Sequence, residues 1–348
     1  MDKLKSLFSF WATGPDAPRI EDQEQVDRSY RKIRRGLVVF LTLGYGTYYV
    51  CRLALSVIKK PLIDNGIFTA EELGQIGSAL FFGYAAGKIT NGFLSDHTNT
   101  RRFMVTGLMV SAICNIVMGF STALRVFTIM WALNGWFQSF GAASSVVTLS
   151  RWFSNSERGV YYGIWSSSHS IGEGLTYIGT AFVVAAFGWR AGFIGAGAFG
   201  LAFCILLAIF IKDRPQTLGL PAVADWRNDH IASTRAEGAS SKQSPKEVLA
   251  VQLGMFKHPA VWVLGLASAS MYVTRYAVDS WGILYLQESR GLDLKSAGTL
   301  LGINTLAGIG GSIAYGFISD KLFNAPPAGK SYFCPYRNLR VNRHLLRP

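Results

Sequence analysis

Apolar runs separated by short polar segments follow one another along most of the chain. Each run approaches the ~20 residues that a helix needs to cross a bilayer. Eight runs lie at about 36–58, 74–95, 103–121, 125–148, 160–186, 190–211, 260–287 and 296–318. The pattern predicts an all-α polytopic membrane protein with about eight transmembrane helices. Only the turn Gly188-Trp189-Arg190 divides the fifth run from the sixth.

The polar segments divide the chain into five predicted parts. A polar segment, 1–34, precedes a six-helix bundle, 35–211, and a long linker, 212–256, precedes two helices of a second bundle, 257–323. The tail, 324–348, is polar and basic, and we expect it to be disordered. Lys and Arg are more numerous beside the spans on the side that carries the basic N-terminal segment, the linker and the tail. By the positive-inside rule, both termini are expected in the cytoplasm.

Composition supports a membrane protein and argues against other classes. Of 348 residues, 50% are hydrophobic and 16% are charged, whereas soluble domains carry about 25% charged residues. The net charge of +13 is spread over short segments between the apolar runs, so a nucleic-acid partner is not expected. The sequence has no CxxC motif, no phosphate-cradling loop that ends in Lys-Ser/Thr and no recognisable catalytic arrangement. We therefore expect that the protein is not an enzyme and that it has no cofactor and no metal site.

A repeat places one arginine in the first apolar run of each half. Tyr49-Val50-Cys51-Arg52 recurs as Tyr272-Val273-Thr274-Arg275, and Gly92–Asp96 recurs as Gly316–Asp320 at nearly the same displacement. Such a duplicated unit is common in transporters. A cation within hydrocarbon costs roughly 2.5–3.5 kcal/mol, so it usually faces a polar cavity. Two guanidinium groups that face each other predict an anion site, because each offers a planar fork to two phosphate oxygens.

Two aromatic and basic stripes accompany the first arginine. Tyr45 and Tyr49 are spaced i, i+4, and Arg52 follows three residues later, so the three share a helical face. Lys88 follows Tyr84 by four residues in the second run. These residues are candidates for the wall of the anion site. The alternative for the tyrosines is an aromatic belt at the membrane interface.

Other polar residues leave alternatives open. Each arginine could instead pair with a carboxylate, Glu173 or Asp279, as structure only. Lys88 either adds to the anion field or neutralises Glu173. His169 is either a satisfied core residue or a ligand-binding group. Because Glu173 lies four residues after His169, the two could form a proton relay, although a carboxylate that neutralises a basic group is the more common arrangement.

Several motifs together carry a family resemblance. They are Gly44-Tyr45-Gly46-Thr47-Tyr48-Tyr49-Val50-Cys51-Arg52, Gly83-Tyr84 with Gly87-Lys88, Ser95-Asp96-His97-Thr98-Asn99, Gly135-Trp136-Phe137-Gln138, Ser156-Glu157-Arg158-Gly159, Ile164-Trp165 with His169, Gly188-Trp189-Arg190, and Asp213-Arg214-Pro215-Gln216-Thr217-Leu218-Gly219-Leu220-Pro221. In this order, the chain resembles the organophosphate:phosphate antiporter family of the major facilitator superfamily, and within it the bacterial hexose-phosphate sensor/transporter subgroup.

The resemblance implies a fold, a function and a site. It implies a major facilitator fold that exchanges an organic phosphate, with hexose phosphate favoured, for inorganic phosphate by alternating access in the bacterial inner membrane. The substrate-binding positions that it implies are Arg52, Arg275, Tyr45, Tyr49, Tyr84, Lys88 and His169. The loops around Asp96, Arg101, Arg102 and Asp320 resemble the superfamily's gating loops; the alternative is that they are ordinary charged turns.

The chain departs from the family pattern. Leu53 follows the first arginine where a second basic residue is common, Glu173 replaces a usual glycine, and Asp279 lies one position earlier than usual. The repeat predicts six spans in the second half, whereas two are present, so we expect a chain truncated at its C-terminus. Two rival functions follow. One is a membrane sensor of external sugar phosphate that signals to a histidine kinase, and the other is an inactive truncated fragment.

Overall fold

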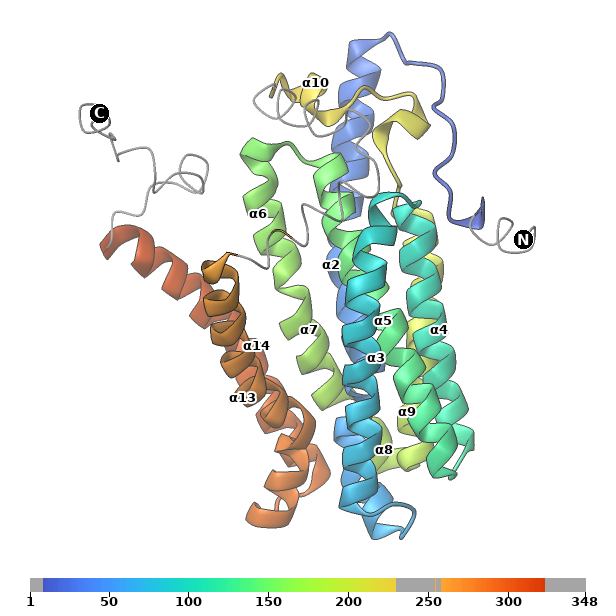
Figure 1. Ribbon diagram of the computed structural model, residues 1–348, viewed down its shortest axis with the longest axis vertical. Coiled ribbons are helices and arrows are strands. Elements are labelled where there is room, and N and C mark those ends of the chain that lie inside the picture. Colours follow the sequence, from blue (N-terminus) through green and yellow to red (C-terminus); the bar gives the residue numbers. More distant parts are fainter. Residues whose placement is uncertain (1–8, 230–253, 255–257, 323–348) are drawn as a thin grey trace, which may run out of the picture.

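The described part of the protein consists of helices. The computed structural model describes residues 9–229, 254 and 258–322, and these contain no β-strand (Figure 1). The predicted tail 324–348 and most of the linker 212–256 lie outside the described residues. The all-α prediction is therefore confirmed for the residues that the structure describes.

Each predicted span coincides with a helix or a chain of helices. They are α2 (Gln23–Asp64), α3 (Ala70–Asp96), α4 (Thr100–Phe120), α5 (Leu124–Trp152), α6 to α8 (Asn155–Phe187), α9 (Trp189–Phe210), α13 (Pro259–Arg290) and α14 (Leu294–Leu322). Two short elements, η2 (Pro215–Leu218) and α10 (Val223–Arg227), follow α9. Helix α2 begins well before its predicted span, because residues 23–35 continue the helix as a polar extension.

The fifth predicted span is not one regular helix. It consists of α6 (Asn155–Ser166), α7 (Ser168–Leu175), the π-helical turn η1 (Thr176–Thr180) and α8 (Ala181–Phe187). Gly188 then adopts a φ of 83°, a left-handed conformation that glycine accepts without steric strain, and α9 begins at the next residue. The predicted division at this Gly-Trp-Arg turn is confirmed.

Helix starts follow local capping chemistry. At the start of α3, the Thr69 side chain accepts a hydrogen bond from the Glu72 backbone N–H, and the Glu72 carboxylate accepts one from the Thr69 N–H. This capping box satisfies two backbone donors that the first helical turn leaves open. Asn99 caps α4 in a similar way through the Arg102 N–H.

Four helical segments are long and apolar enough to cross a membrane. These are α2, α4, the α6–α8 segment and α9, judged among the described residues. Helices α3, α5, α13 and α14 are not among these four segments. Membrane crossing by these other helices remains a prediction.

Helices α3 and α5 touch through their backbones. A Cβ atom added to Gly135 would collide with the carbonyl oxygen of Leu80, and one added to Gly83 would collide with that of Ala132. Only a residue without a side chain therefore fits at either position. Small residues allow this approach, as they often do between membrane helices.

The two halves contact each other at one end. We call the end that carries the start of α2, the end of α9 and α10 the linker end, and the opposite end, with the Gly291 turn between α13 and α14, the turn end (Figure 1). Near the turn end, Leu53 and Val57 of α2 form an apolar cluster with Ile283 and Leu301 of the second half.

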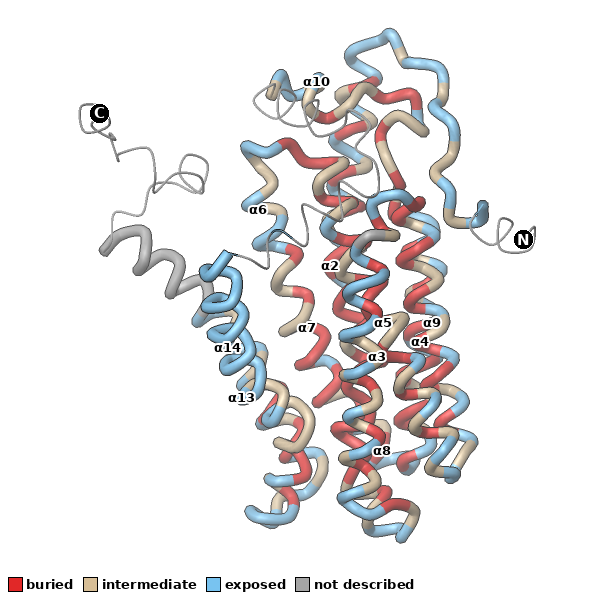
Figure 2. Tube along the Cα trace, in the orientation of Figure 1, coloured by how far each residue is buried: buried red, intermediate tan, exposed pale blue. Residues whose placement is uncertain are grey.

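Burial of the second half decreases toward the linker end. Residues 258–273 of α13 and its cap are exposed throughout, while Ile283, Leu284 and Gln287 are buried. Figure 2 shows the same change as a shift from red and tan to pale blue along both helices. Among the residues that the structure describes, the halves are therefore packed together toward the turn end, and the part of α13 nearer the linker end is exposed.

Candidate functional site

Arg52 lies between the two halves in a cage of aromatic rings. It is only 6% exposed, and its guanidinium carbon is 4.3 Å from the centroid of the Tyr84 ring, 5.9 Å from that of Tyr49 and 5.5 Å from that of Tyr276. Its Nη2 donates a long hydrogen bond, 3.5 Å, to the Tyr276 hydroxyl. Among the described residues, no carboxylate forms an ion pair with Arg52. The guanidinium fork is therefore not neutralised within the described chain.

Arg275, its counterpart in the repeat, has two carboxylate partners. Its Nη2 is 2.5 Å from Oε1 of Glu173, and its Nε is 3.4 Å from Oδ2 of Asp279. Glu173 is buried, and Asp279 also accepts a hydrogen bond from the Tyr177 hydroxyl at 3.4 Å. The alternative of structural pairing with a carboxylate thus describes Arg275 but not Arg52.

The predicted tyrosines pack inside the helix bundle. The Tyr45 ring is 5.6 Å from that of Tyr49 and 5.0 Å from that of Trp165. Tyr49 lies 6.2 Å from the His169 ring, measured between centroids. These contacts place the two tyrosines toward α6 and α7 and not on an interfacial belt. His169 in turn borders an open cavity of about 470 Å³ between α6, α7 and α14.

Lys88 shares one aromatic ring with Arg52. Its Nζ lies 5.2 Å from the centroid of Tyr84, on the ring that Arg52 also contacts. Glu173 is paired with Arg275 instead. The alternative that Lys88 neutralises Glu173 is therefore wrong, and Lys88, which is exposed, adds positive charge beside the arginine.

Lys59 belongs to the same region, although its place in the sequence did not reveal it. The prediction assigned it to the polar segment after the first span, but α2 continues to Asp64 and Lys59 is 1% exposed. Its Nζ lies 3.3 Å from the centroid of the Trp281 ring and 3.0 Å from the Ser280 Oγ. Lys59 lies seven residues, or about two helical turns, after Arg52, so the two cations share one face of α2. This spacing was a signal that Lys59 faces the second half together with Arg52.

A small cavity separates these two cations. It measures about 30 Å³ and is bordered by Arg52, Lys59, Tyr276, Asp279 and Ser280 among others. Its size corresponds to about one water molecule. In this conformation the cavity next to Arg52 on the turn-end side is thus too small for a sugar.

The predicted gating residues lie at the linker end. Asp96 is exposed, and its backbone carbonyl accepts a hydrogen bond from Arg151 Nη2 at 3.1 Å. Arg102 Nη1 donates to the Phe10 carbonyl at 2.9 Å. Arg101 lies near Lys212, where burial first and then this neighbouring charge lower the pKa of the lysine. Asp320 belongs to α14, but its side chain lies outside the described residues.

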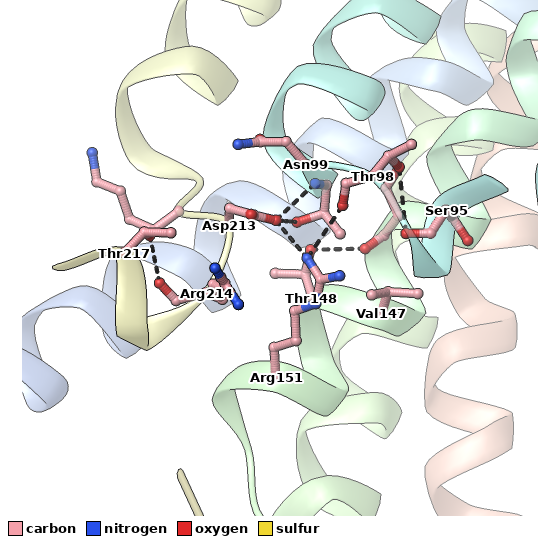
Figure 3. Close-up of polar contacts among 12 residues, drawn as sticks. Ser95, Thr98, Asn99, Val147, Thr148, Arg151, Asp213, Arg214 and Thr217 are labelled. Carbon is pink, nitrogen blue, oxygen red and sulfur yellow. Dashed lines mark hydrogen bonds and ion pairs between the residues drawn. The ribbon is translucent and has the colours of Figure 1, made fainter. Parts of the chain in front are cut away.

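A different carboxylate, Asp213, forms an ion pair with Arg151 at this end. It is buried, lies 2.5 Å from Arg151 Nη1, and accepts hydrogen bonds from the Thr100 backbone N–H and hydroxyl at 2.9 and 3.2 Å. Figure 3 shows these contacts converging on Asp213 between the ends of the helices. The signal for Asp213 was its place directly after the sixth span, in the distinctive Asp-Arg-Pro run.

The structure therefore brings most of the predicted residues into one region. Arg52, Tyr49, Tyr84 and Lys88 are connected by ring contacts, and Tyr45 and His169 adjoin Tyr49. Within the residues that the structure describes, no group of three or more His, Cys, Asp or Glu side chains could hold a metal ion. The arrangement suits an anion with an apolar or sugar-like body, since cations and ring faces line it together.

Comparison with known proteins gives a consistent family. The sequence profile described as Major Facilitator Superfamily matches residues 37–330. The membrane sensor protein UhpC of Salmonella typhimurium is 36% identical over 319 residues, which cover 91% of this chain and 71% of that protein. A probable hexose phosphate transport protein of Chlamydia pneumoniae is 33% identical, with coverage of 87% and 68%. The glycerol-3-phosphate transporter of Haemophilus influenzae is 30% identical, with coverage of 88% and 67%.

Solved structures agree at the level of the fold. A bacterial homologue of the human lysosomal transporter Spinster, in an inward-facing and unoccupied conformation, superposes with a TM-score of 0.65 at 16% identity. The match covers 84% of this chain and 64% of that one. At this identity the similarity concerns the helical architecture alone.

Proposed function

The chain belongs to the organophosphate:phosphate antiporter family of the major facilitator superfamily, and we propose that it exchanges an organic phosphate for inorganic phosphate by alternating access. A hexose phosphate is the favoured substrate. The observation that carries this proposal is the environment of Arg52, a buried guanidinium with aromatic neighbours from both halves and no carboxylate partner among the described residues.

The chemistry of the site supports a phosphorylated substrate. A guanidinium remains charged at physiological pH and binds two phosphate oxygens at once. Lys88, next to the same tyrosine, adds a second positive charge. The faces of Tyr49 and Tyr84 offer apolar surfaces for the C–H groups of a sugar. In this proposal Arg275 joins the site by exchanging a carboxylate for the phosphoryl group.

The contacts between the halves support a direction of access. The turn end is packed, with Lys59 against Trp281 and Lys60 2.6 Å from Glu288, while α13 is exposed toward the linker end. With both termini in the cytoplasm of a bacterial inner membrane, this state would admit substrate from the cytoplasm. The loops at Asp96, Arg101, Arg102 and Asp320 would then open and close the linker end, and Asp213 would hold the linker to α4 and α5.

An exchange assay tests the function. Purified full-length chain is reconstituted into liposomes that contain inorganic phosphate, and uptake of labelled glucose 6-phosphate is measured. We expect uptake that requires internal phosphate and that unlabelled glucose 6-phosphate suppresses. Specific binding without any uptake would refute exchange and favour the sensor function, which the similarity to UhpC makes the second candidate. Absence of both binding and uptake would refute the site as well.

A further inference from the structure

A second basic cavity lies at the linker end, far from Arg52. It measures about 650 Å³ and is bordered by the start of α2, by Tyr161 of α6 and by Trp226 and Arg227 of α10. We call it the arginine pocket, because Arg31, Arg34, Arg35 and Arg227 all line it. Arg34 is 18 residues before Arg52 on the same helix, or about 27 Å at 1.5 Å per residue. The two cavities are therefore separate sites.

Positive charge in the arginine pocket exceeds negative charge. Arg34 and Arg227 share one carboxylate, Glu157, at 2.5 and 3.1 Å. Arg31 lies 3.9 Å from Asp27, a distance at the limit of an ion pair. Arg35 forms no ion pair within the described residues. These four guanidinium groups have two carboxylate ion-pair partners among the described residues, so two of the four positive charges are not matched.

One buried donor in the pocket has no partner within the described part of the chain. Arg34 is 6% exposed, and no described residue accepts a hydrogen bond from its Nε. The rings of Phe153, Tyr161 and Trp226 surround its guanidinium carbon at 4.5, 5.3 and 5.2 Å from their centroids. Trp226 is itself held by a hydrogen bond to Asp27 at 2.7 Å. The pocket is thus built and held in shape by side chains from three segments of the chain.

The pocket opens where the helix surfaces change from charged to apolar. Arg31, Arg35 and Val39 are spaced i, i+4 and i+8, so they follow one face of α2. The Arg31 side chain is 69% exposed and Val39 is 51% exposed. On α6, Val160 and Ile164 are also exposed apolar residues. A face that turns from cationic to apolar within about 6 Å is expected at the boundary between headgroups and hydrocarbon.

From these observations we propose that the arginine pocket binds the headgroup phosphate of an anionic phospholipid. The phosphate lies between Arg31 and Arg35, and an acyl chain follows Val39 and Leu43, which is also exposed. A soluble phosphate would meet the same arginines, but the exposed apolar continuation of the face favours a lipid. Because Trp226 and Arg227 lie in α10 of the linker, a bound lipid would fasten this part of the linker to α2.

Lipid titration of matched variants tests this proposal. Phosphatidylglycerol is titrated into detergent-purified full-length chain, and bound lipid is counted by native mass spectrometry. The pocket variant is Arg31→Gln/Arg35→Gln. The control is Arg28→Gln/Lys32→Gln, which removes the same charge from α2 at exposed positions that do not line the pocket. We expect the pocket variant to lose roughly 10–30-fold in affinity and the control to lose less than about threefold.

Three results would overturn the proposal. Equal losses in both variants would show diffuse attraction of charge and no pocket. No loss in the pocket variant would refute the site. Displacement of the lipid from the unmodified chain by excess inorganic phosphate or glucose 6-phosphate would show that the pocket takes a soluble phosphate. Both variants change exposed residues, and a monodisperse chromatographic profile verifies that each remains folded.

Discussion

Arg52 and Arg275 occupy matching positions in two copies of one motif, but their surroundings are opposite. Arg52 is caged by rings and has no carboxylate partner in the described part of the chain, while Arg275 is held by Glu173 and Asp279. The sequence duplication therefore preserved the arginine but not its partners. The difference suggests that Arg52 is ready to receive an anion, whereas Arg275 has to exchange a partner first.

The largest expected effect is from loss of Arg52. Arg52→Gln removes the guanidinium that has no carboxylate partner among the described residues, and should lower glucose 6-phosphate affinity by about 30-fold or more, since truncation of a buried charge partner costs about 2–5 kcal/mol. Arg52→Lys keeps the charge but not the fork, and should recover only part of the binding. Isothermal titration of the purified variants measures both. Unchanged affinity in Arg52→Gln would remove the basis of the comparison.

Loss of Arg275 should affect stability as well as binding. Arg275→Gln leaves the buried Glu173 without its cation, and breaking a buried pair costs about 3–5 kcal/mol. We expect a lower thermal unfolding midpoint, measured by tryptophan fluorescence, together with weaker binding. Adding Glu173→Gln should restore most of the midpoint but not the binding. If Arg275→Gln alone is as stable as the parent, the pairing with Glu173 is not the main role of this arginine.

Glu173→Gln alone should act in the opposite direction. It removes the closer of the two carboxylate partners of Arg275. The second partner, Asp279, remains 3.4 Å from the arginine Nε. We expect phosphate affinity to rise by roughly 3–10-fold, equivalent to about 1 kcal/mol. Glu24→Gln is a control, because it removes a carboxylate that is paired with Arg28 and borders neither cavity. A fall in affinity in Glu173→Gln would mean that this carboxylate binds substrate directly.

The smallest effect on binding is expected from Lys59. It is also a buried cation without a carboxylate partner among the described residues, but it contacts Trp281 and Ser280 and not the ring cage. Lys59→Met should leave substrate affinity within about twofold and should change the exchange rate, because it alters packing at the turn end. A large loss of affinity, comparable with that of Arg52→Gln, would place Lys59 in the binding site and erase the contrast.

The helices were predictable because hydrophobic length is a local property of the chain. The positions of the eight long helical segments and the division at Gly188 could be assigned from residue order alone. Arg52 could be singled out because a cation is costly in an apolar run, and its recurrence at the same place in the second half argues against chance. Its lack of a carboxylate partner could not be predicted, because partners such as Tyr276 come from residues more than two hundred positions away.

The errors have the same physical origin. Lys59 was placed just outside the first predicted run, 36–58, because a basic residue after an apolar run usually marks the membrane boundary, whereas contact with Trp281 keeps it buried. Asp213 was noticed as part of a motif, but its ion pair with Arg151 depends on how two distant helix ends meet. The break of the fifth span into α6, α7 and α8 also had no clear signal in its hydrophobic pattern.

The contact of α3 with α5 through glycines has a consequence for substrate recognition. Tyr84 follows Gly83 directly, and Gly83 touches the α5 backbone with no side-chain layer between them. Interdigitated side chains can rearrange by rotamer changes, but two touching backbones cannot slide past each other in that way. The ring that Arg52 and Lys88 share is therefore carried by a pair of helices that must tilt as a single stiff unit. A methyl group at Gly83 would collide with the α5 backbone, and its first consequence would be a displaced Tyr84 ring.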